Sequence, residues 1–238
     1  MDPVFPTNCT SGAVLVLPAP CSSGISCPSL AIDLLLNTYP SKRVAVSKSP
    51  FVQPFVSSAA VDRSSLGVVT AALELHLLSD GIFALQLRAP LFEGCAAAFM
   101  ESLVHWIQLQ PLSKIIFIAE APAHRKVDTF LGKGNVFALE SASSAPAALA
   151  QSQRVHAVPR EVGCRALGDN SFSCHLISRI ASASLSCIFA FSSGDSVASA
   201  FALAAEAVKL SNAAECSLQQ PSSWSRSLLP PIDQSIFG

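Results

Sequence analysis

Short runs of almost entirely apolar residues recur along this chain, and they constrain its fold more than any other feature. The clearest are residues 13–17 (AVLVL), 114–119 (KIIFIA) and 184–191 (SLSCIFAF). A continuous apolar run of this length is typical of a strand that is buried on both faces. Such strands lie in sheets that helices cover on both sides, so the runs favour an α/β fold.

The first of these runs opens a predicted β-α-β unit. Ser26 or Ser29 can cap the helix that follows it, because a serine hydroxyl accepts a hydrogen bond from the first turn. Residues 42–47 then form the next short strand. A strand, a helix and a strand in this order predict two parallel strands joined by a right-handed crossover.

A β-hairpin is predicted after a surface loop at residues 48–65. Residues 68–78 and 82–88 are largely apolar, and the Asp-Gly pair between them is a strong turn signal. Residues 93–108 then carry apolar side chains at near-helical spacing, and Pro111 ends this predicted helix. Its apolar residues are Phe99, Leu103, Val104, Trp106 and Ile107.

The second half of the chain is harder to assign. Residues 120–180 show weak periodicity, and residues 141–150 (SASSAPAALA) are close to low complexity. A helix is predicted over residues 197–210, with the Asp195 side chain as its N-terminal cap.

Length and composition agree with one large domain that binds a partner. For 238 residues we expect a single α/β domain over residues 1–210 and an extended C-terminal tail over residues 211–238. Half of the residues are hydrophobic and 13% are charged, which excludes intrinsic disorder. The net charge of -1 gives no electrostatic footprint for nucleic acid or anionic lipid, so we expect neither as a partner. A surface poor in charge favours association with another protein.

Two further features bear on where the protein acts. The longest uncharged run, residues 3–32, is interrupted by prolines and does not predict a membrane span, and the N-terminus lacks the basic start of a secretory signal. The eight cysteines include no C-x-x-C pair, which favours reduced, buried thiols over disulfides or a zinc site. We expect a cytoplasmic protein without a metal, and entry into the nucleus stays open.

Catalytic motifs are weak along this chain. Gly132–Lys133–Gly134 lacks the other residues of a phosphate-binding loop and suits a turn, and residues 194–196 suit a helix cap better than a hydrolase serine. The densest polar cluster contains His124, Arg125 and Asp128, just after a buried strand, where open α/β sheets commonly bind ligands. These three residues are a candidate secondary site, with an ordinary solvated loop as the alternative.

The C-terminal residues form another candidate site. Trp224 and the final Ile236, Phe237 and Gly238 place large apolar groups on a tail that has no evident core to enter. A pocket on a partner can take the Ile and Phe side chains while a cation binds the adjacent carboxylate. The alternative is a tail that folds back on its own domain or frays.

Several segments together resemble one known family. Residues 12–36 (GAVLVLPAPCSSGISCPSLAIDLLL) are similar to its opening strand, loop and helix, and residues 83–94 (FALQLRAPLFEG) are the most specific match. A helix, a strand, a polar block, the Gly194–Asp195 turn and PSSW at 221–224 follow in the family's order. On these segments the chain resembles the proteasome assembly chaperone 2 proteins of eukaryotes, whereas residues 132–180 are hard to match.

The resemblance implies a fold and a function. The implied fold is a single three-layer α/β domain with a central mixed β-sheet flanked by helices, of phosphorylase-like architecture. The implied function is that of a non-enzymatic chaperone, without cofactor or catalytic residues, that forms a heterodimer with proteasome assembly chaperone 1. The pair would bind the α subunits of the forming 20S proteasome, promote correct α-ring formation and prevent off-pathway α-ring dimers.

The resemblance also implies a role for the C-terminus. Ring-binding partners of the proteasome dock a C-terminal hydrophobic-tyrosine-any motif between α subunits, and Ile236, Phe237 and Gly238 fit this motif with Phe in place of Tyr. The missing hydroxyl loses one hydrogen bond, worth about 0.5–1.5 kcal/mol. Two alternatives stay open. One is a phosphorylase-like or hydrolase-like enzyme that uses the polar cluster on a small anionic substrate, and the other is an adaptor with no link to the proteasome.

Overall fold

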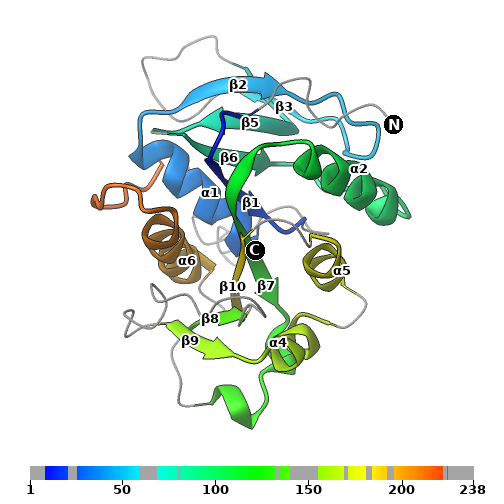
Figure 1. Cartoon of the computed structure of the whole chain (residues 1–238), viewed down its shortest axis with the longest axis vertical. Helices are drawn as coiled ribbons and strands as arrows, with labels where there is room; N and C mark the ends of the chain where they lie inside the picture. Colours follow the sequence, from blue (N-terminus) through cyan, green and yellow to red (C-terminus); the bar gives the residue numbers. More distant parts are fainter. Residues whose placement is uncertain are drawn as a thin grey trace, which may run out of the picture.

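A mixed β-sheet lies at the centre of the molecule (Figure 1). The computed structural model describes residues 9–20, 26–58, 69–79, 81–131, 135–139, 155–168, 171–180, 184–191, 196–221 and 224. Eight strands lie in the order β2-β5-β6-β1-β7-β10-β8-β9, and β3 pairs with β4 in a separate two-stranded sheet. The strands are β1 (Ala13–Pro18), β2 (Lys42–Val46), β3 (Val56–Ser58), β4 (Val69–Ala71), β5 (Leu73–Leu77), β6 (Ile82–Leu87), β7 (Leu112–Ala121), β8 (Val136–Leu139), β9 (Val155–Val158) and β10 (Ser184–Phe191).

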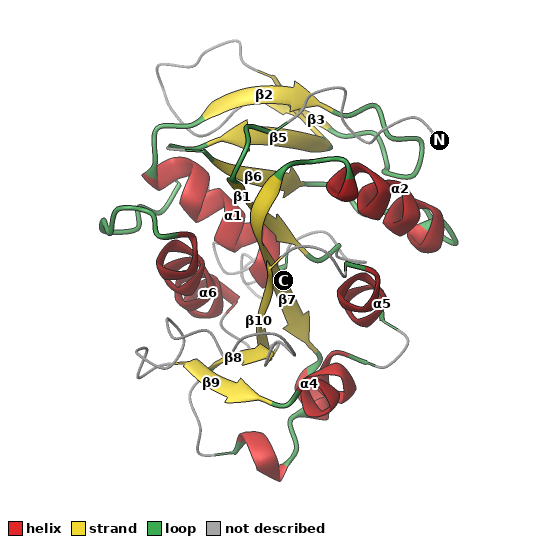
Figure 2. Cartoon of the chain, viewed as in Figure 1, coloured by secondary structure: helices red, strands yellow, loops and turns green. Residues whose placement is uncertain are grey.

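Helices cover both faces of this sheet (Figure 2). The residues of α1 and α6 pack on one face, and those of α2, α4 and α5 pack on the other. The predicted single three-layer α/β domain with a central mixed sheet is therefore confirmed. The helices are α1 (Cys27–Thr38), α2 (Ala96–Gln108), α4 (Arg160–Leu167), α5 (Phe172–Arg179) and α6 (Ser196–Ser211), with 3-10 turns η1 (Ala123–Arg125) and η2 (Asp128–Phe130).

The four central strands, β6, β1, β7 and β10, are parallel, and the strands outside them bring in antiparallel pairs. On one side, β5 is antiparallel to β6 and β2 is antiparallel to β5. On the other side, β8 is antiparallel to β10 and parallel to β9. Strands β1 and β2 therefore run in the same direction, as the β-α-β unit predicts, but the β5–β6 hairpin separates them.

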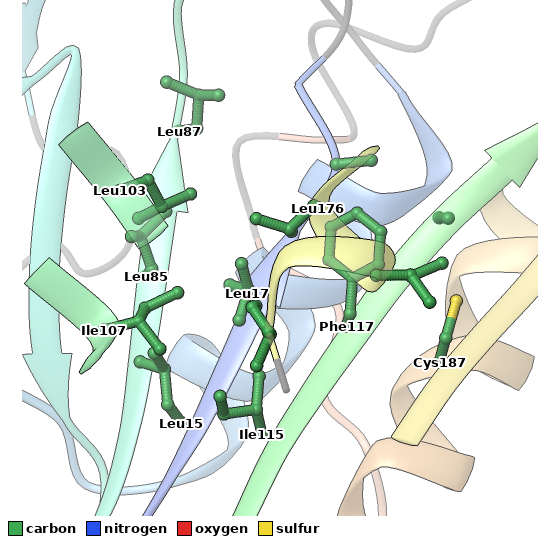
Figure 3. Close-up of a cluster of buried hydrophobic side chains, with 14 of the residues drawn as sticks. Leu15, Leu17, Leu85, Leu87, Leu103, Ile107, Ile115, Phe117, Leu176 and Cys187 are labelled. Carbon is green, nitrogen blue, oxygen red and sulfur yellow. The ribbon is translucent and has the colours of Figure 1, made fainter. Parts of the chain in front are cut away.

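Alternate residues of the central strands supply two separate hydrophobic cores. Leu15 and Leu17 of β1 and Phe117 of β7 point toward α2 and α5 (Figure 3). Val16 and Ile116, which are their neighbours in the chain, lie in the cluster beneath α1 and α6. Since successive side chains of a strand point to opposite faces, a strand between two helical layers is apolar at every position. This is the physical basis of the apolar runs in the sequence.

The predicted helices are present, and their caps explain where they begin and end. Ser26 is the N-cap of α1, and its side chain accepts a hydrogen bond from the Ser29 N–H. Helix α2 buries the apolar side chains expected of it and ends before Pro111, and α6 matches the helix predicted at 197–210. The predicted Asp195 cap lies outside the described residues.

Other predictions need correction. The segment predicted as a loop at residues 48–65 contains β3, which pairs with β4 through Val56 and Ala71. The first strand of the predicted hairpin is divided into β4 and β5, and β7 is longer than its apolar run. Residues 120–180, which sequence left unassigned, contribute strands β8 and β9 and helices α4 and α5.

Among the described residues, no helix is long and apolar enough to cross a membrane.

Candidate functional site

The parallel strands β6, β1, β7 and β10 end at one side of the sheet, here called the carboxyl edge. Ligands of open α/β sheets commonly bind at this edge, next to the helix N-termini that face it. Helix α1 begins here, directly after β1, and the 3-10 turns η1 and η2 follow β7. The chemistry available at the carboxyl edge therefore tests the enzyme interpretation most directly.

In the described first turn of α1, the backbone N–H groups of Cys27, Ser29 and Leu30 all have acceptors within the chain. The Cys27 N–H donates to Glu120 Oε2 at 3.1 Å, so a carboxylate of the chain itself takes the place that a phosphate would occupy. The Ser29 and Leu30 N–H groups donate to the side-chain and backbone oxygens of Ser26. Pro28 has no N–H to offer. These described N–H groups are therefore satisfied by the chain itself rather than by a bound anion.

The described cysteines near this edge and in the cores are poorly suited to nucleophilic chemistry. Burial, together with the nearby Glu120 carboxylate, raises the pKa of the Cys27 thiol to about 11. Burial alone raises the pKa of Cys9 to about 11, and the pKa of the fully enclosed Cys187 shifts in the same direction. Within the described ranges, no group of three His, Cys, Asp or Glu side chains is placed to hold a metal ion.

The predicted secondary site is a solvent-facing turn. His124 and Arg125 lie on η1 and Asp128 begins η2, and all three are exposed. Arg125 Nη1 donates to the carbonyl oxygen of Arg165 at 3.1 Å, in the last turn of α4, where a cation stabilises the helix dipole. Gly168 makes this contact possible because any Cβ there would lie 2.7 Å from Arg125 Nη1. A structural role for Arg125 is thus visible, and a ligand for the cluster stays a prediction.

Several exposed apolar side chains lie at or after the ends of strands that point to the carboxyl edge, on segments that are separated along the sheet. Of six large hydrophobic residues that are exposed in the described part of the chain, only Leu109 lies at the opposite edge, after α2. The others follow the ends of β2, β6 or β7, and they are Val46, Phe55, Phe92, Val127 and Leu131. Exposed aromatic residues at one place are typical of a surface that binds another protein.

Phe55 and Phe92 belong to two loops that pair with each other. Val52 and Leu91 form an isolated antiparallel bridge, and the Phe92 N–H donates to the carbonyl oxygen of Phe51 at 2.9 Å. Phe55 and Phe92 are 39% and 43% exposed. We call the exposed side chains of these two paired loops the Phe55–Phe92 surface. Sequence reasoning noted residues 83–94 only as a family resemblance.

The predicted C-terminal site is only partly within the described residues. Trp224 is buried, with 4% of its surface exposed, and its ring meets Phe201 of α6 edge-to-face at 6.5 Å between centroids. The expectation that it has no core to enter is wrong, because α1 and α6 together supply one. Ile236, Phe237 and Gly238 lie outside the described residues, so their role stays a prediction.

Sequence reasoning missed two carboxylates of low exposure, the half-buried Asp33 and the buried Glu74. Asp33 lies on α1 and accepts a hydrogen bond from Gln86, with Arg88 Nη2 at 3.3 Å. Its only sequence signal is an acidic residue inside the apolar run AIDLLL. Glu74 lies on β5 and is 1% exposed.

Comparison with known proteins supports the predicted fold. No protein-family model matches the chain, and no curated protein matches its sequence. Among solved structures, Pyrococcus furiosus PbaA, an archaeal homolog of proteasome-assembly chaperone, matches with a TM-score of 0.64 and 13% identity, over 94% of this chain and 92% of that one. Pyrococcus furiosus PbaB, an archaeal proteasome activator, matches with a TM-score of 0.62 and 14% identity, over 99% and 97%. A Thermoplasma acidophilum protein of unknown function matches with a TM-score of 0.62 and 13% identity, over 95% and 86%.

At these identities the likeness is one of fold, and it agrees with the resemblance to proteasome assembly chaperone 2 proteins that the sequence shows. Over nearly its whole length, this chain has the fold of the archaeal proteasome-assembly chaperone homologue and the archaeal proteasome activator.

Proposed function

We propose that this protein is a non-enzymatic chaperone of proteasome assembly that acts in the cytoplasm. The observation that carries the proposal is the shared fold with PbaA and PbaB, which covers more than nine tenths of each chain. In the finer form of the proposal, the protein pairs with proteasome assembly chaperone 1, and the pair binds the α subunits of the 20S proteasome, helping the ring to form and preventing off-pathway ring dimers.

The carboxyl edge supports binding over catalysis. Phosphate binding at this edge would need free backbone N–H groups. The described N–H groups in the first turn of α1 already donate to Glu120 and Ser26. The thiol nearest this position, Cys27, has a raised pKa because it is buried next to a carboxylate, so it stays protonated and unreactive. A phosphorylase-like activity would therefore need donors other than the N–H groups of Cys27, Ser29 and Leu30.

The Phe55–Phe92 surface supports a protein partner. Each ring that a partner covers contributes about 1.5–3 kcal/mol, before the cost of ordering is subtracted. Arg43 and Lys42 on the neighbouring edge strand β2 are exposed, and charged residues on an edge strand oppose sheet-to-sheet aggregation. A specific side-chain contact is thus favoured over strand addition at this end of the sheet.

The C-terminal motif supplies the proposed contact with the α ring. Docking of Ile236 and Phe237 in pockets between α subunits would use apolar burial and a carboxylate–cation pair, as the resemblance implies. With Phe in place of Tyr the tail is expected to be a weak anchor, and bivalent binding with the partner's tail compensates for that weakness.

Co-purification tests the proposal. The full chain and a chain that ends at Ser235 are expressed in the native cells, and the proteins captured with each are identified. We expect the full chain to bring proteasome assembly chaperone 1 and α subunits, and the shortened chain to keep only the partner chaperone. Recovery of no proteasome component by either chain would overturn the proposal.

Two surface variants sharpen that test. Phe92→Glu places a charge on the Phe55–Phe92 surface, and Leu109→Glu places the same charge on the most exposed apolar side chain of the opposite edge. We expect Phe92→Glu to lose a captured partner and Leu109→Glu to keep it. Thermal stabilisation of the protein by millimolar phosphate, lost in Arg125→Ala, would instead favour the enzyme alternative.

A further inference from the structure

Helices α2 and α5 are neighbours on the face of the sheet opposite α1 and α6 (Figure 2), and a cavity opens between them. The two helices pack together near their N-terminal ends, where the ring centroids of Phe99 and Phe172 lie 6.1 Å apart. The cavity is lined by one side of α2 and by the last residue of α5. We call it the α2–α5 groove, and its lining residues are Met100, Glu101, Val104, His105, Gln108 and Arg179.

The groove combines an apolar floor with polar walls. Met100 and Val104, one helical turn apart on α2, are buried and form the floor. Glu101 and His105 lie beside them on the same helix and are exposed. Arg179 is exposed on the α5 side. Apolar surface with a few polar groups around it is the usual construction of a small-molecule site.

The charged side chains of the groove are not used within the described part of the chain. None of the ion pairs and side-chain hydrogen bonds between described residues involves Glu101, His105 or Arg179. His105 and Arg179 lie in the last turns of their helices, where a basic side chain complements the helix dipole. Glu101 lies beyond the first turn of α2, so the dipole does not account for its charge. The groove therefore offers a carboxylate and a guanidinium group to a ligand.

The size of the groove limits what can enter it. Its volume is about 170 Å³, whereas pockets for drug-sized ligands have roughly 300–1,000 Å³. At about 30 Å³ for each water molecule, the groove has room for about six waters. A nucleoside or nucleotide is too large to be enclosed there, and a molecule of the size of one amino acid fits.

We propose that the α2–α5 groove binds a small zwitterion with an aliphatic side chain, of the class of the free aliphatic amino acids. Arg179 donates to the carboxylate of the ligand, and Glu101 accepts from its ammonium group. Met100 and Val104 contact its aliphatic side chain. The opposite charges of the two walls favour a ligand with both charges, because a ligand with only one leaves one wall without a partner. This site does not rest on the proposed function.

NMR titration of the full chain with four probes tests the site. L-Leucine has all three features, glycine lacks the aliphatic side chain, N-acetyl-L-leucine lacks the ammonium group and L-leucinamide lacks the carboxylate. We expect leucine to shift the amide resonances of α2 and α5 with a dissociation constant of about 1 mM or below. We expect each of the other probes to bind at least about tenfold more weakly. A dissociation constant for leucine above about 1 mM, or equal affinities for the four probes, would overturn the proposal.

Two variants test which side chain reads which charge. In Arg179→Met, leucine and leucinamide should bind equally weakly, because the partner of the carboxylate is gone. In Glu101→Gln, leucine and N-acetylleucine should bind equally weakly for the corresponding reason. The matched controls are Arg165→Met and Glu93→Gln, which change exposed residues outside the groove and should keep the preference for leucine. All four positions are exposed, so the fold should tolerate each change. If the preference for leucine survives Arg179→Met or Glu101→Gln, or is lost in the controls, recognition of a zwitterion by this groove is wrong.

Discussion

Glu74 is buried and Asp33 is half-buried, and each has an arginine nearby, yet their surroundings shift the pKa values of the two carboxylates in opposite directions. Burial raises the pKa of Glu74, but hydrogen bonds from His76, the Ala71 N–H and Arg43 outweigh it and hold the pKa below its usual value. Arg43 Nη1 lies 2.7 Å from Glu74 Oε1. At Asp33 the arginine, Arg88, is at 3.3 Å, and burial prevails, so the pKa of Asp33 is raised.

The difference separates a carboxylate that its partners keep ionised from one whose charge is disfavoured by burial. Glu74 on β5 joins Arg43 on β2 to the backbone of β4, so its negative charge connects three strands at one end of the molecule. Asp33 gains less from its charge than it loses by burial, although Gln86 donates to it and Arg88 lies nearby. The comparison implies that charge is needed at Glu74, whereas an acceptor oxygen is what is needed at Asp33.

The largest effect is expected from Trp224→Ala. Removal of the buried indole leaves a cavity beside Phe201 of α6. Such substitutions cost about 3–5 kcal/mol of unfolding free energy. Urea unfolding followed by far-UV circular dichroism measures this loss. The matched control is Phe92→Ala, an exposed aromatic residue, which should change stability by no more than about 0.5 kcal/mol. Similar small losses for both variants would show that Trp224 is not held in the core.

Glu74→Gln is the next test, and it addresses the charge itself. The amide keeps the shape but cannot serve three donors, and it leaves Arg43 without its buried partner. We expect a loss of about 1–3 kcal/mol, at the lower range for buried pairs because the Arg43 side chain is 36% exposed and can regain water. Unfolding curves at neutral pH measure it. If Glu74→Gln is as stable as the wild type, the ionised carboxylate of Glu74 does not stabilise the fold.

The pH dependence of that loss gives a further, smaller signal. Because the folded pKa of Glu74 lies below its unfolded value of about 4.3, its stabilising effect is complete above that value and is lost as pH falls through the folded pKa. The stability gap between the wild type and Glu74→Gln should therefore narrow on acidification below about pH 4.3. Asp33 has the opposite sign: its ionised form lowers stability at neutral pH, and protonation relieves this cost as pH falls through its raised pKa. A gap that widens in acid would contradict the assignment.

Local patterns in the sequence predict some elements of this fold, whereas contacts between distant segments are not predictable from it. Strands β1, β7 and β10 were predictable because burial on both faces removes polar residues from a local run. The cap at Ser26 was predictable because capping acts within one turn. Strands β8 and β9 are only four residues each, and their pairing depends on distant segments. The partners of Asp33 likewise come from the end of β6 and just beyond it, far away in the chain.

At the candidate site, too, local features were predictable and contacts between distant segments were not. The polar cluster at His124 was visible as local composition, but its exposure and the use of Arg125 by α4 depend on packing between distant segments. Burial of Trp224 was predicted wrongly for the same reason, since the space that receives it is formed by α1 and α6, from opposite ends of the sequence.

Asp33→Asn should have the smallest effect, and it separates the two carboxylates most sharply. The substitution removes a charge that burial disfavours and keeps an oxygen that can accept from Gln86. It also removes the ion pair with Arg88, whose side chain is 23% exposed and whose loss is worth less than about 1 kcal/mol. The two changes oppose each other, so we expect stability within about 1 kcal/mol of the wild type by the same urea measurement. Since Glu74→Gln also replaces a carboxylate with an amide, it is the matched comparison. If Asp33→Asn destabilises the protein as much as Glu74→Gln does, the Asp33 charge itself holds the fold, and the distinction between the two carboxylates fails.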